Sequence, residues 1–527
     1  MFEAGWRKRQ WSELDPLWDV IVIGGGITGA AVYRRSVSTG FKTLLVEAND
    51  FSFGTSSKSS KLVHGGFRYL KNRQFDVTRE SVREREWLVK SSQGLVTPMS
   101  FVMPYSAHKV MKKAFGIGVV IYDLLAPKWQ HSHLSLQKTR QVVPLLSSDW
   151  IKGSYRYYDA VVDDSRLVMR LIEETTSEGG VALNYSHVSG LLKDANGQVN
   201  GVSIEDISGQ ALGTANVHAR VVINATGPWS DVLRSEVGAS SRTRPLRGSH
   251  LVFSHKRLPI HSAVTLLHPK DRRAMFAIPW EGTTLVGTTD LDHTDNLETR
   301  EPYCTQAEVD YILEAANATF PEVHLGKQDI ISSFAGVRPI VRGDSTDPSK
   351  ESRAHVVWDE HGLLTITGGK LTIFRIMAED TLKVVSAKLE QPLKPLNQWF
   401  KPVHRDSKPN RIEAATWNYL LARYGDAIQP LLETANEEEL LPIQPLANTL
   451  AELRYAARNT AVEHLDDLLL RRVRLGMLLP DGANEVLGTI KPIVQSELNW
   501  DERRWQEEVN RYRAIYDGAY SPQPTGN

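Results

Sequence analysis

The amino-acid sequence predicts an α/β protein in which a Rossmann-like dinucleotide-binding domain carries an inserted antiparallel β-sheet domain and precedes a helical C-terminal domain. Three observations lead to this fold class. Residues 19–23 form a β-branched run that enters a glycine-rich turn and a helix, residues 248–329 hold short β-rich segments, and a proline-rich stretch at 391–410 precedes a region with helical spacing. At 527 residues the chain has room for two or three such domains.

The first unit is a strand, a helix and a second strand. Residues 19–23 (DVIVI) are apolar without alternation, as expected for a parallel strand that is buried on both faces. Gly24, Gly26 and Gly29 follow in the G-x-G-x-x-G spacing that lets a pyrophosphate approach the backbone. The next strand, residues 42–46, ends at Glu47, where a carboxylate can bind ribose hydroxyls. The unit therefore predicts a dinucleotide site.

Two further glycine turns favour flavin over nicotinamide as the nucleotide. The strand at 220–225 ends in Ala225, Thr226 and Gly227, which resemble the ATG segment that many flavoproteins with two dinucleotide-binding domains place beside the FAD. The strand at 363–367 ends in a second turn at Gly368 and Gly369, which taken alone could equally be an ordinary turn. A helix N-terminus after that second turn would stabilise the negative charge of a reduced flavin. Because these strands are far apart in the chain, we expect one sheet assembled from separated segments.

These segments give the predicted domain boundaries. The prolines at 392, 395, 402 and 409 mark a linker. Beyond the linker, residues 448–479 have helical spacing, and the last ten residues are expected to form a loose tail. We assign 18–104, 151–247 and 330–390 to the FAD-binding domain, 105–150 and 248–329 to the substrate-binding domain, 391–410 to the linker and 411–520 to the C-terminal domain.

Composition excludes several classes of protein. The 62 Lys and Arg residues balance 62 Asp and Glu residues, so no overall field favours nucleic acid. The lone Cys304 cannot form an internal disulfide, which indicates a reducing, cytoplasmic compartment. No apolar run is long enough to span a membrane, and the N-terminus is not a signal peptide. Residues 115–125, preceded by Lys112 and Lys113, are either a core segment or a peripheral contact with inner-membrane lipids.

Paired acidic residues do not predict a metal site. Asp163 and Asp164 lack a further ligand cluster at suitable spacing, so we expect them to cap the helix that begins near Ser165, and Asp290 is likewise expected to be structural. In the C-terminal region, residues 466–472 (DDLLLRR) place two acids four to six residues before two arginines, which predicts either solvated or interdomain ion pairs.

The longest motif is residues 55–70, TSSKSSKLVHGGFRYL. It resembles the segment TSSxSSKLxHGGxRYL of the FAD-dependent, aerobic-type glycerol-3-phosphate dehydrogenase family. The resemblance covers residues 18 to about 390 well and residues 466–472 more loosely. It implies an FAD-binding domain of the glutathione-reductase and amino-acid-oxidase type.

The resemblance also implies an activity. The reaction would be oxidation of sn-glycerol 3-phosphate to dihydroxyacetone phosphate, with hydride transfer to flavin N5 and electrons passed to a quinone or other acceptor. An oxidase that uses oxygen and a non-catalytic FAD-binding regulatory protein remain the alternatives. A homodimer and peripheral attachment to the cytoplasmic face of the membrane are left open.

The resemblance implies site residues of two kinds. Arg68, Tyr69, Arg338 and Lys370 would bind the substrate phosphate, and Arg338 and Lys370 would also act in catalysis. For the base we favour His250 over Lys370, because an ordinary histidine pKa of ~6.5 suits proton acceptance near neutrality. The residues expected to bind FAD are Gly24, Gly26, Thr28, Gly29, Glu47, Thr55, Ser56, Ser60, Lys61, His64, Gly65, Gly66, Ala225, Thr226, Gly227, Gly369, Lys370 and Leu371.

Overall fold

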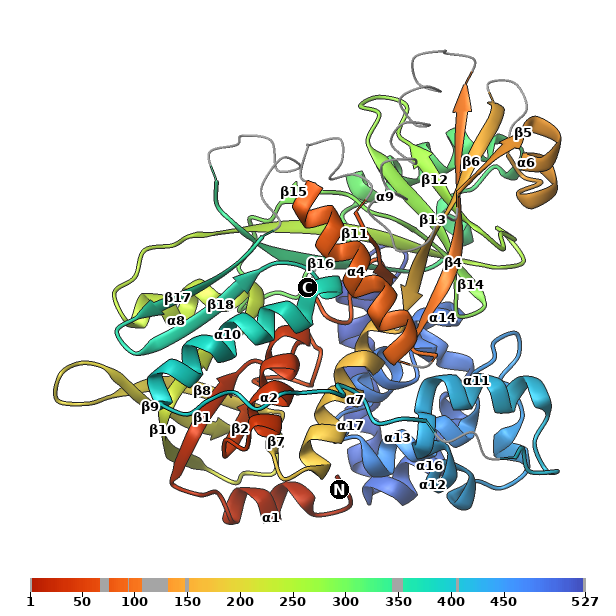
Figure 1. Ribbon diagram of the computed structural model, residues 1–527. Helices are drawn as coiled ribbons and strands as arrows, with labels where there is room; N and C mark the ends of the chain where they lie inside the picture. Colours follow the sequence, from red (N-terminus) through yellow and green to blue (C-terminus); the bar gives the residue numbers. More distant parts are fainter. Residues whose placement is uncertain are drawn as a thin grey trace.

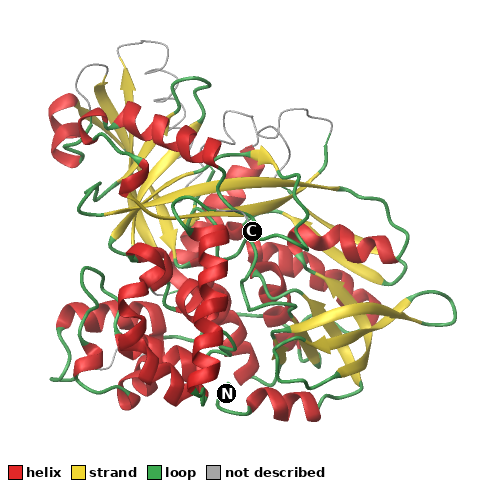
Figure 2. Cartoon of the chain, turned by 180° about the vertical axis from the view of Figure 1, so that it is seen from behind, coloured by secondary structure: helices red, strands yellow, loops and turns green. Residues whose placement is uncertain are grey.

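The computed structural model contains two β-sheets and a helical C-terminal region (Figure 1). The described residues are 2–66, 75–92, 94–106, 131–146, 151–343, 354–403 and 407–524. Figure 2 shows the C-terminal helices beside one sheet and beneath the other.

The eight-stranded sheet has the order β17-β18-β10-β1-β2-β7, and β8 and β9 extend it from β10. Strands β18, β10, β1, β2 and β7 run parallel to one another. The strands expected at 19–23, 42–46, 220–225 and 363–367 are confirmed as β1, β2, β10 and β18. The strand bounds are β1 (Leu17–Ile23), β2 (Thr43–Val46), β7 (Val181–Leu183), β8 (Ser186–Lys193), β9 (Val199–Asp206), β10 (Thr214–Asn224), β17 (His355–Glu360) and β18 (Leu363–Gly368).

Three long helices pack against this parallel sheet. Helix α2 (Ile27–Thr39) contacts both α7 (Asp164–Ser177) and α10 (Phe374–Leu389). Asp163 caps α7, because its Oδ1 accepts a hydrogen bond of 3.1 Å from the backbone N–H of Arg166, as expected from the sequence. The short helix α8 (Ser230–Glu236) packs near β18. This arrangement turns the N-terminus of α2 toward the carboxyl ends of the parallel strands, where such sheets bind ligands.

The ten-stranded sheet has the order β15-β11-β14-β13-β12-β4-β6-β3, with β16 beside β11 and β5 beside β6. All its pairs are antiparallel except β12 with β4. The antiparallel sheet expected within 248–329 is confirmed. Its strand bounds are β3 (Leu62–Val63), β4 (Val96–Ser106), β5 (Ser132–Ser135), β6 (Ile151–Val162), β11 (Thr243–Ser254), β12 (Ala263–Leu267), β13 (Ala274–Trp280), β14 (Thr283–Gly287), β15 (Leu291–Asp292) and β16 (Ile330–Val341).

Strand pairing divides the chain differently from our sequence boundaries. We gave most of β4 and all of β6 and β16 to the FAD-binding ranges, yet all three pair within the ten-stranded sheet. β16 runs antiparallel to β11 along nearly its whole length. Strand propensity is local, whereas the choice of partner depends on residues far away in the chain, so the sequence does not reveal this assignment.

The remaining helices form the C-terminal region and cover the sheets. The stretch at 448–479 is not one helix but α13, the π-helical turn η8 and α14. The bounds are α1 (Trp6–Ser12), α4 (Phe75–Ser91), α6 (Leu136–Val142), α9 (Gln306–Thr319), α11 (Ala414–Tyr424), α12 (Ile428–Thr434), α13 (Leu450–Asn459), η8 (Asp467–Arg472), α14 (Leu475–Leu478), α15 (Pro480–Ala483), α16 (Leu487–Leu498), α17 (Glu502–Ile515) and the π-helical turn η10 (Tyr516–Tyr520).

Described residues near both ends of the chain contact other parts of the molecule. The Arg7 side chain on α1 is 1% exposed, and it donates hydrogen bonds to Asn184 O at 2.7 Å and to Glu463 Oε1 at 2.8 Å. The loose tail we expected is wrong for its first residues, because Tyr520 is buried and its hydroxyl donates to Glu301 Oε1 at 2.8 Å. The N-terminal extension and the tail therefore both tie the C-terminal region to the sheets.

The predicted linker carries no helix or strand over residues 391–403, and it is held against the parallel-sheet domain. Arg34 and Arg170 donate hydrogen bonds to the carbonyls of Trp399 and Lys401. No helix among the described residues is long and apolar enough to cross a membrane. Lys112, Lys113 and residues 115–125 lie outside the described residues.

Candidate functional site

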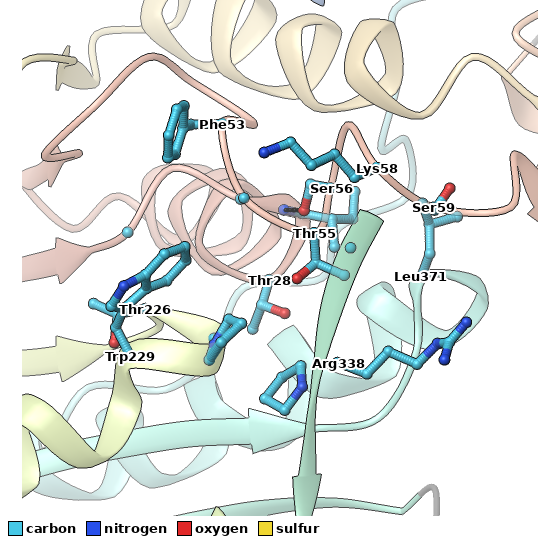
Figure 3. A pocket seen from close by; sticks show the side chains of 18 of the residues that line it. Thr28, Phe53, Thr55, Ser56, Lys58, Ser59, Thr226, Trp229, Arg338 and Leu371 are labelled. Carbon is cyan, nitrogen blue, oxygen red and sulfur yellow. Dashed lines mark hydrogen bonds between the residues drawn. The ribbon is translucent and has the colours of Figure 1, made fainter. Parts of the chain in front are cut away.

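A cavity of about 860 Å³ is lined by residues from both sheets. Its walls include the turns that follow β1, β2, β10 and β18, which meet at the carboxyl edge of the parallel sheet. In Figure 3, Thr28, Thr55 and Ser56 lie between Trp229 on one side and Arg338 on the other. The cavity therefore brings the glycine turn after β1 and the cationic side chain of Arg338 into one space.

The glycine turn brings α2 close to β1. Gly24 has a φ of +110°, and a Cβ placed there would lie 2.6 Å from the carbonyl oxygen of Ala225. A Cβ on Gly29 would lie 1.8 Å from the carbonyl oxygen of Gly24. Ser56 Oγ accepts a 2.9 Å hydrogen bond from the Ile27 N–H, which fixes the segment 55–60 against the start of the helix. The helix N-terminus thus faces the cavity as an anion-binding group.

Glu47 lies beside this turn. Its Oε2 accepts a 2.6 Å hydrogen bond from Gly25 N–H, and its Oε1 accepts one of 2.8 Å from Asn49 N–H. Burial raises the pKa of the Glu47 carboxyl. Each oxygen keeps a further lone pair, so the side chain can also accept hydrogen bonds from hydroxyl groups in the cavity. Asn49 and the neighbouring residues 186–189 line this end and were not among the predicted site residues.

The opposite end of the cavity carries positive charge. Arg338 Nη1 lies 3.1 Å from Asp290 Oδ1, and Arg338 Nη2 lies 3.3 Å from Thr288 Oγ1. Lys370 follows the turn after β18 and lines the same cavity. Gly369 in that turn has a φ of +67°, and a Cβ there would lie 2.6 Å from Met377 Sδ. The turn therefore needs glycine to bring Lys370 to the cavity.

His250 lies behind the cavity wall instead of on its surface. It is buried on β11, its ring stacks on Phe334 at 4.8 Å between centroids, and its Nε2 is hydrogen-bonded to Ser60 Oγ at 2.8 Å. Burial, together with the charges of Arg338 and Lys61, holds the pKa of His250 well below its ordinary value. The imidazole is therefore neutral, and Ser60, which lines the cavity, separates it from the interior space.

Lys61 is also interior. Its Nζ lies 2.9 Å from Asp164 Oδ2, with both side chains fully buried. Burial and the charge of Arg474 lower the pKa of Lys61 to about 8, against the opposing effect of Asp164. Lys61 therefore anchors the 55–66 segment to the start of α7.

Most of the residues expected to bind FAD line this cavity. These are Gly24, Gly26, Thr28, Glu47, Thr55, Ser56, Ser60, His64, Ala225, Thr226, Gly227, Gly369, Lys370 and Leu371. Gly29, Lys61, Gly65 and Gly66 are not in its lining. Arg68 and Tyr69 lie outside the described residues.

The comparisons with known proteins agree with this geometry. Residues 19–375 match the family described as FAD dependent oxidoreductase, and residues 370–505 match the C-terminal domain of alpha-glycerophosphate oxidase. The chain is 33% identical, over 87% of both sequences, to an aerobic glycerol-3-phosphate dehydrogenase of Staphylococcus saprophyticus. The chain belongs to the FAD-dependent glycerol-3-phosphate dehydrogenase family.

One further relative and two solved structures are similar to this chain over most of its length. A Staphylococcus epidermidis aerobic glycerol-3-phosphate dehydrogenase is 39% identical over 72% of the chain and 68% of that protein. The crystal structure of a Bacillus halodurans glycerol-3-phosphate dehydrogenase complexed with FAD covers both chains completely, with a TM-score of 0.77 and 27% identity. The L-alpha-glycerophosphate oxidase of Mycoplasma pneumoniae shares the fold, with a TM-score of 0.58 and 18% identity over 73% of this chain and 97% of that chain.

The cofactor of the dehydrogenase is FAD, and the cavity fits it. The close glycine turn and the N-terminus of α2 suit a pyrophosphate, and the Glu47 carboxylate suits a ribose. Lys370 at the turn after β18 supplies positive charge at the other end. The sequence predicted these three features because each depends on a local motif.

Proposed function

We propose that this dehydrogenase oxidises sn-glycerol 3-phosphate to dihydroxyacetone phosphate and passes the electrons to a quinone. The observation that carries the proposal is the cationic end of the FAD cavity, where Arg338 and Lys370 line one space. Such charges suit a phosphate dianion, and they would be superfluous for an uncharged alcohol. The family relatives named for this substrate support the same reading.

The reaction needs hydride and proton acceptors. FAD, when bound, supplies the hydride acceptor for C2 of the substrate. The chain supplies the proton acceptor: the neutral His250 takes the C2 hydroxyl proton through the Ser60 hydroxyl, which is hydrogen-bonded to its Nε2 at 2.8 Å. Because Ser60 lines the cavity and His250 does not, the serine is the bridge between substrate and base.

The cations have two roles. Arg338 binds the phosphate through a guanidinium that Asp290 and Thr288 hold in place. Lys370 both binds the substrate and stabilises the negative charge that develops on the C2 oxygen as its proton leaves. Arg68 and Tyr69, in the same motif as the FAD-binding segment, complete the phosphate contacts in this proposal.

The electron acceptor distinguishes two candidate functions. The match of residues 370–505 to a domain of alpha-glycerophosphate oxidase favours oxygen as the alternative to quinone. A quinone acceptor would bring the enzyme to the inner-membrane surface, with Lys112, Lys113 and residues 115–125 as the proposed peripheral contact. A homodimer remains part of this proposal.

The test is an assay of dihydroxyacetone phosphate with the purified holoenzyme and sn-glycerol 3-phosphate. A quinone analogue, oxygen and NAD⁺ are offered side by side as acceptors. We expect rapid product formation with the quinone analogue and slow formation with oxygen. Fast hydrogen peroxide production would favour the oxidase, and no product with any acceptor would refute the proposed substrate.

A further inference from the structure

Arg273 forms the second half of a guanidinium pair at the cationic end of the cavity. Its Nη2 lies 3.1 Å from Asp290 Oδ2, while Arg338 Nη1 lies 3.1 Å from Asp290 Oδ1. One carboxylate therefore stands between two guanidinium groups. The Asp290 side chain is 1% exposed, whereas those of Arg273 and Arg338 are 16% and 27% exposed. Both arginines line the cavity, so part of each faces the substrate space.

The ten-stranded sheet holds Arg273 in its position. It directly precedes β13, and its Nε donates a 3.3 Å hydrogen bond to the carbonyl oxygen of Thr288. Arg338 comes from β16, and its own Nη2 reaches the side chain of Thr288. Two segments that are far apart in the sequence thus present their guanidinium groups around the same Asp290 and Thr288.

Positive charge gathers at this end of the cavity. The side chains of Arg273, Arg338 and Lys370 all line it. Asp290 has two carboxylate oxygens, one near each guanidinium group, whereas each guanidinium group carries several N–H donors. Cationic side chains on the wall of a cavity attract an anion.

We propose that Arg273 is a further substrate-binding residue, which holds the phosphate of the substrate together with Arg338. The proposal rests on the proposed function. A phosphate can accept hydrogen bonds from two guanidinium groups at once, and Asp290 keeps the pair in place without occupying all of their N–H groups. Arg273 would then select for a phosphorylated substrate over the free alcohol.

The test compares Arg273→Gln with Arg272→Gln in the FAD-loaded enzyme. Arg272 is the adjacent, exposed arginine and does not line the cavity, so its variant controls for the loss of one charge. The measurements are KM and kcat with sn-glycerol 3-phosphate, the competitive inhibition constant of inorganic phosphate, and FAD content. For Arg273→Gln we expect KM and the inhibition constant to rise together by about 10- to 100-fold, with kcat within about 3-fold.

The results of these measurements distinguish a wrong role for Arg273 from a wrong proposed function. If both constants for Arg273→Gln equal those of the wild type, Arg273 does not bind the anion. If Arg273→Gln loses FAD, the variant Arg273→Lys decides, because it keeps the charge but lacks the planar fork. We expect a several-fold rise in both constants for Arg273→Lys, and unchanged constants would overturn the inference. Failure of the proposed function is visible separately, as a wild-type enzyme that does not oxidise the substrate.

Discussion

At the scale of single residues, the proposed proton transfer depends on the environment of His250. The imidazole is buried, bonded to Ser60 and close to the positive charges of Arg338 and Lys61. The imidazole is therefore neutral without any need for high pH, and in the proposed mechanism it reaches the substrate only through the serine hydroxyl. Burial and neutrality were not visible in the sequence, where only the ordinary histidine pKa could be considered.

The first prediction concerns this histidine. His250→Asn should lower kcat by about 10²- to 10⁴-fold, because proton acceptance by a positioned base contributes that much. KM and FAD content should change little, since His250 does not line the cavity. His218→Asn, on an exposed position of β10, is the control and should be fully active. A His250→Asn enzyme with wild-type kcat would remove histidine from the mechanism.

The lowered pKa of His250 also predicts how the rate constant of flavin reduction depends on pH. Since the pKa in the folded enzyme lies well below the ordinary ~6.5, the base stays neutral as the pH falls to that value. The rate constant of flavin reduction should therefore be flat from pH 8 to about 6.5 and fall only in more acid solution. The same shift contributes stability that is present above about pH 6.5 and is lost below it, because the unfolded chain protonates first. Half-maximal reduction at pH 6.5 would contradict this environment.

Substitutions at Arg68 and Lys370 should distinguish phosphate binding from stabilisation of the transition state. Arg68→Ala should mainly raise KM for sn-glycerol 3-phosphate, by about 10- to 100-fold, because it removes a charge-assisted contact to the phosphate. Lys370→Ala should in addition lower kcat, because in the proposed mechanism Lys370 also stabilises the developing alkoxide. Steady-state kinetics at matched FAD content give both constants. If Lys370→Ala changed KM alone, the lysine would have no role in the chemical step.

At the scale of secondary-structure elements, we expect the close contact between α2 and β1 to position the FAD. A Cβ on Gly29 would lie 1.8 Å from the Gly24 carbonyl oxygen, so Gly29→Ala must push the helix away from the strand. We expect this variant to purify with little or no FAD, whereas Gly190→Ala, where a Cβ meets nothing within 4 Å, should keep its full yellow colour. The ratio of flavin absorbance to protein absorbance measures both. Full FAD occupancy in Gly29→Ala would show that the contact is dispensable.

Some elements of the fold and the site could be predicted from the sequence, and others could not. The strand at residues 19–23, the glycine turn and Glu47 were predictable because their signal is contained in about thirty consecutive residues. The guanidinium pair was not, since Arg273 and Arg338 meet only through Asp290 and the pairing of distant strands. The pairing of β16 within the ten-stranded sheet could not be predicted for the same reason. Local patterns identify elements, and tertiary contacts decide which of them share a site.

At the scale of the whole molecule, a buried charge cluster joins the C-terminal region to the parallel-sheet domain. Asp50 Oδ2 accepts a 2.5 Å hydrogen bond from Arg471 Nε, and Asp50 Oδ1 accepts one of 2.7 Å from Arg472 Nη2. Burial alone would raise the pKa of Asp50, but Arg472 and Arg471 hold it below its ordinary value. For residues 466–472 the sequence predicted either solvated or interdomain ion pairs. The pairs of Arg471 and Arg472 with Asp50 are buried and interdomain.

Removing the charge of Asp50 should therefore destabilise the enzyme. Asp50→Asn leaves two buried guanidinium groups without their common carboxylate, which typically costs about 3 to 5 kcal/mol. Asp359→Asn, which breaks an exposed pair with Lys388, should cost less than about 1 kcal/mol. Thermal unfolding followed by flavin fluorescence and circular dichroism compares the two variants. Equal transition temperatures for Asp50→Asn and wild type would show that the cluster does not stabilise the assembly of the domains.

In the proposed function, one cavity holds FAD and a phosphorylated three-carbon alcohol, and the bound FAD oxidises the alcohol. The most direct measurement is the absorbance of the bound flavin in the absence of oxygen, recorded after addition of sn-glycerol 3-phosphate or of glycerol. We predict that glycerol 3-phosphate bleaches the oxidised flavin band rapidly, while glycerol at the same concentration leaves it nearly unchanged. A flavin that stays oxidised with glycerol 3-phosphate, or that is bleached equally by both alcohols, would contradict the account.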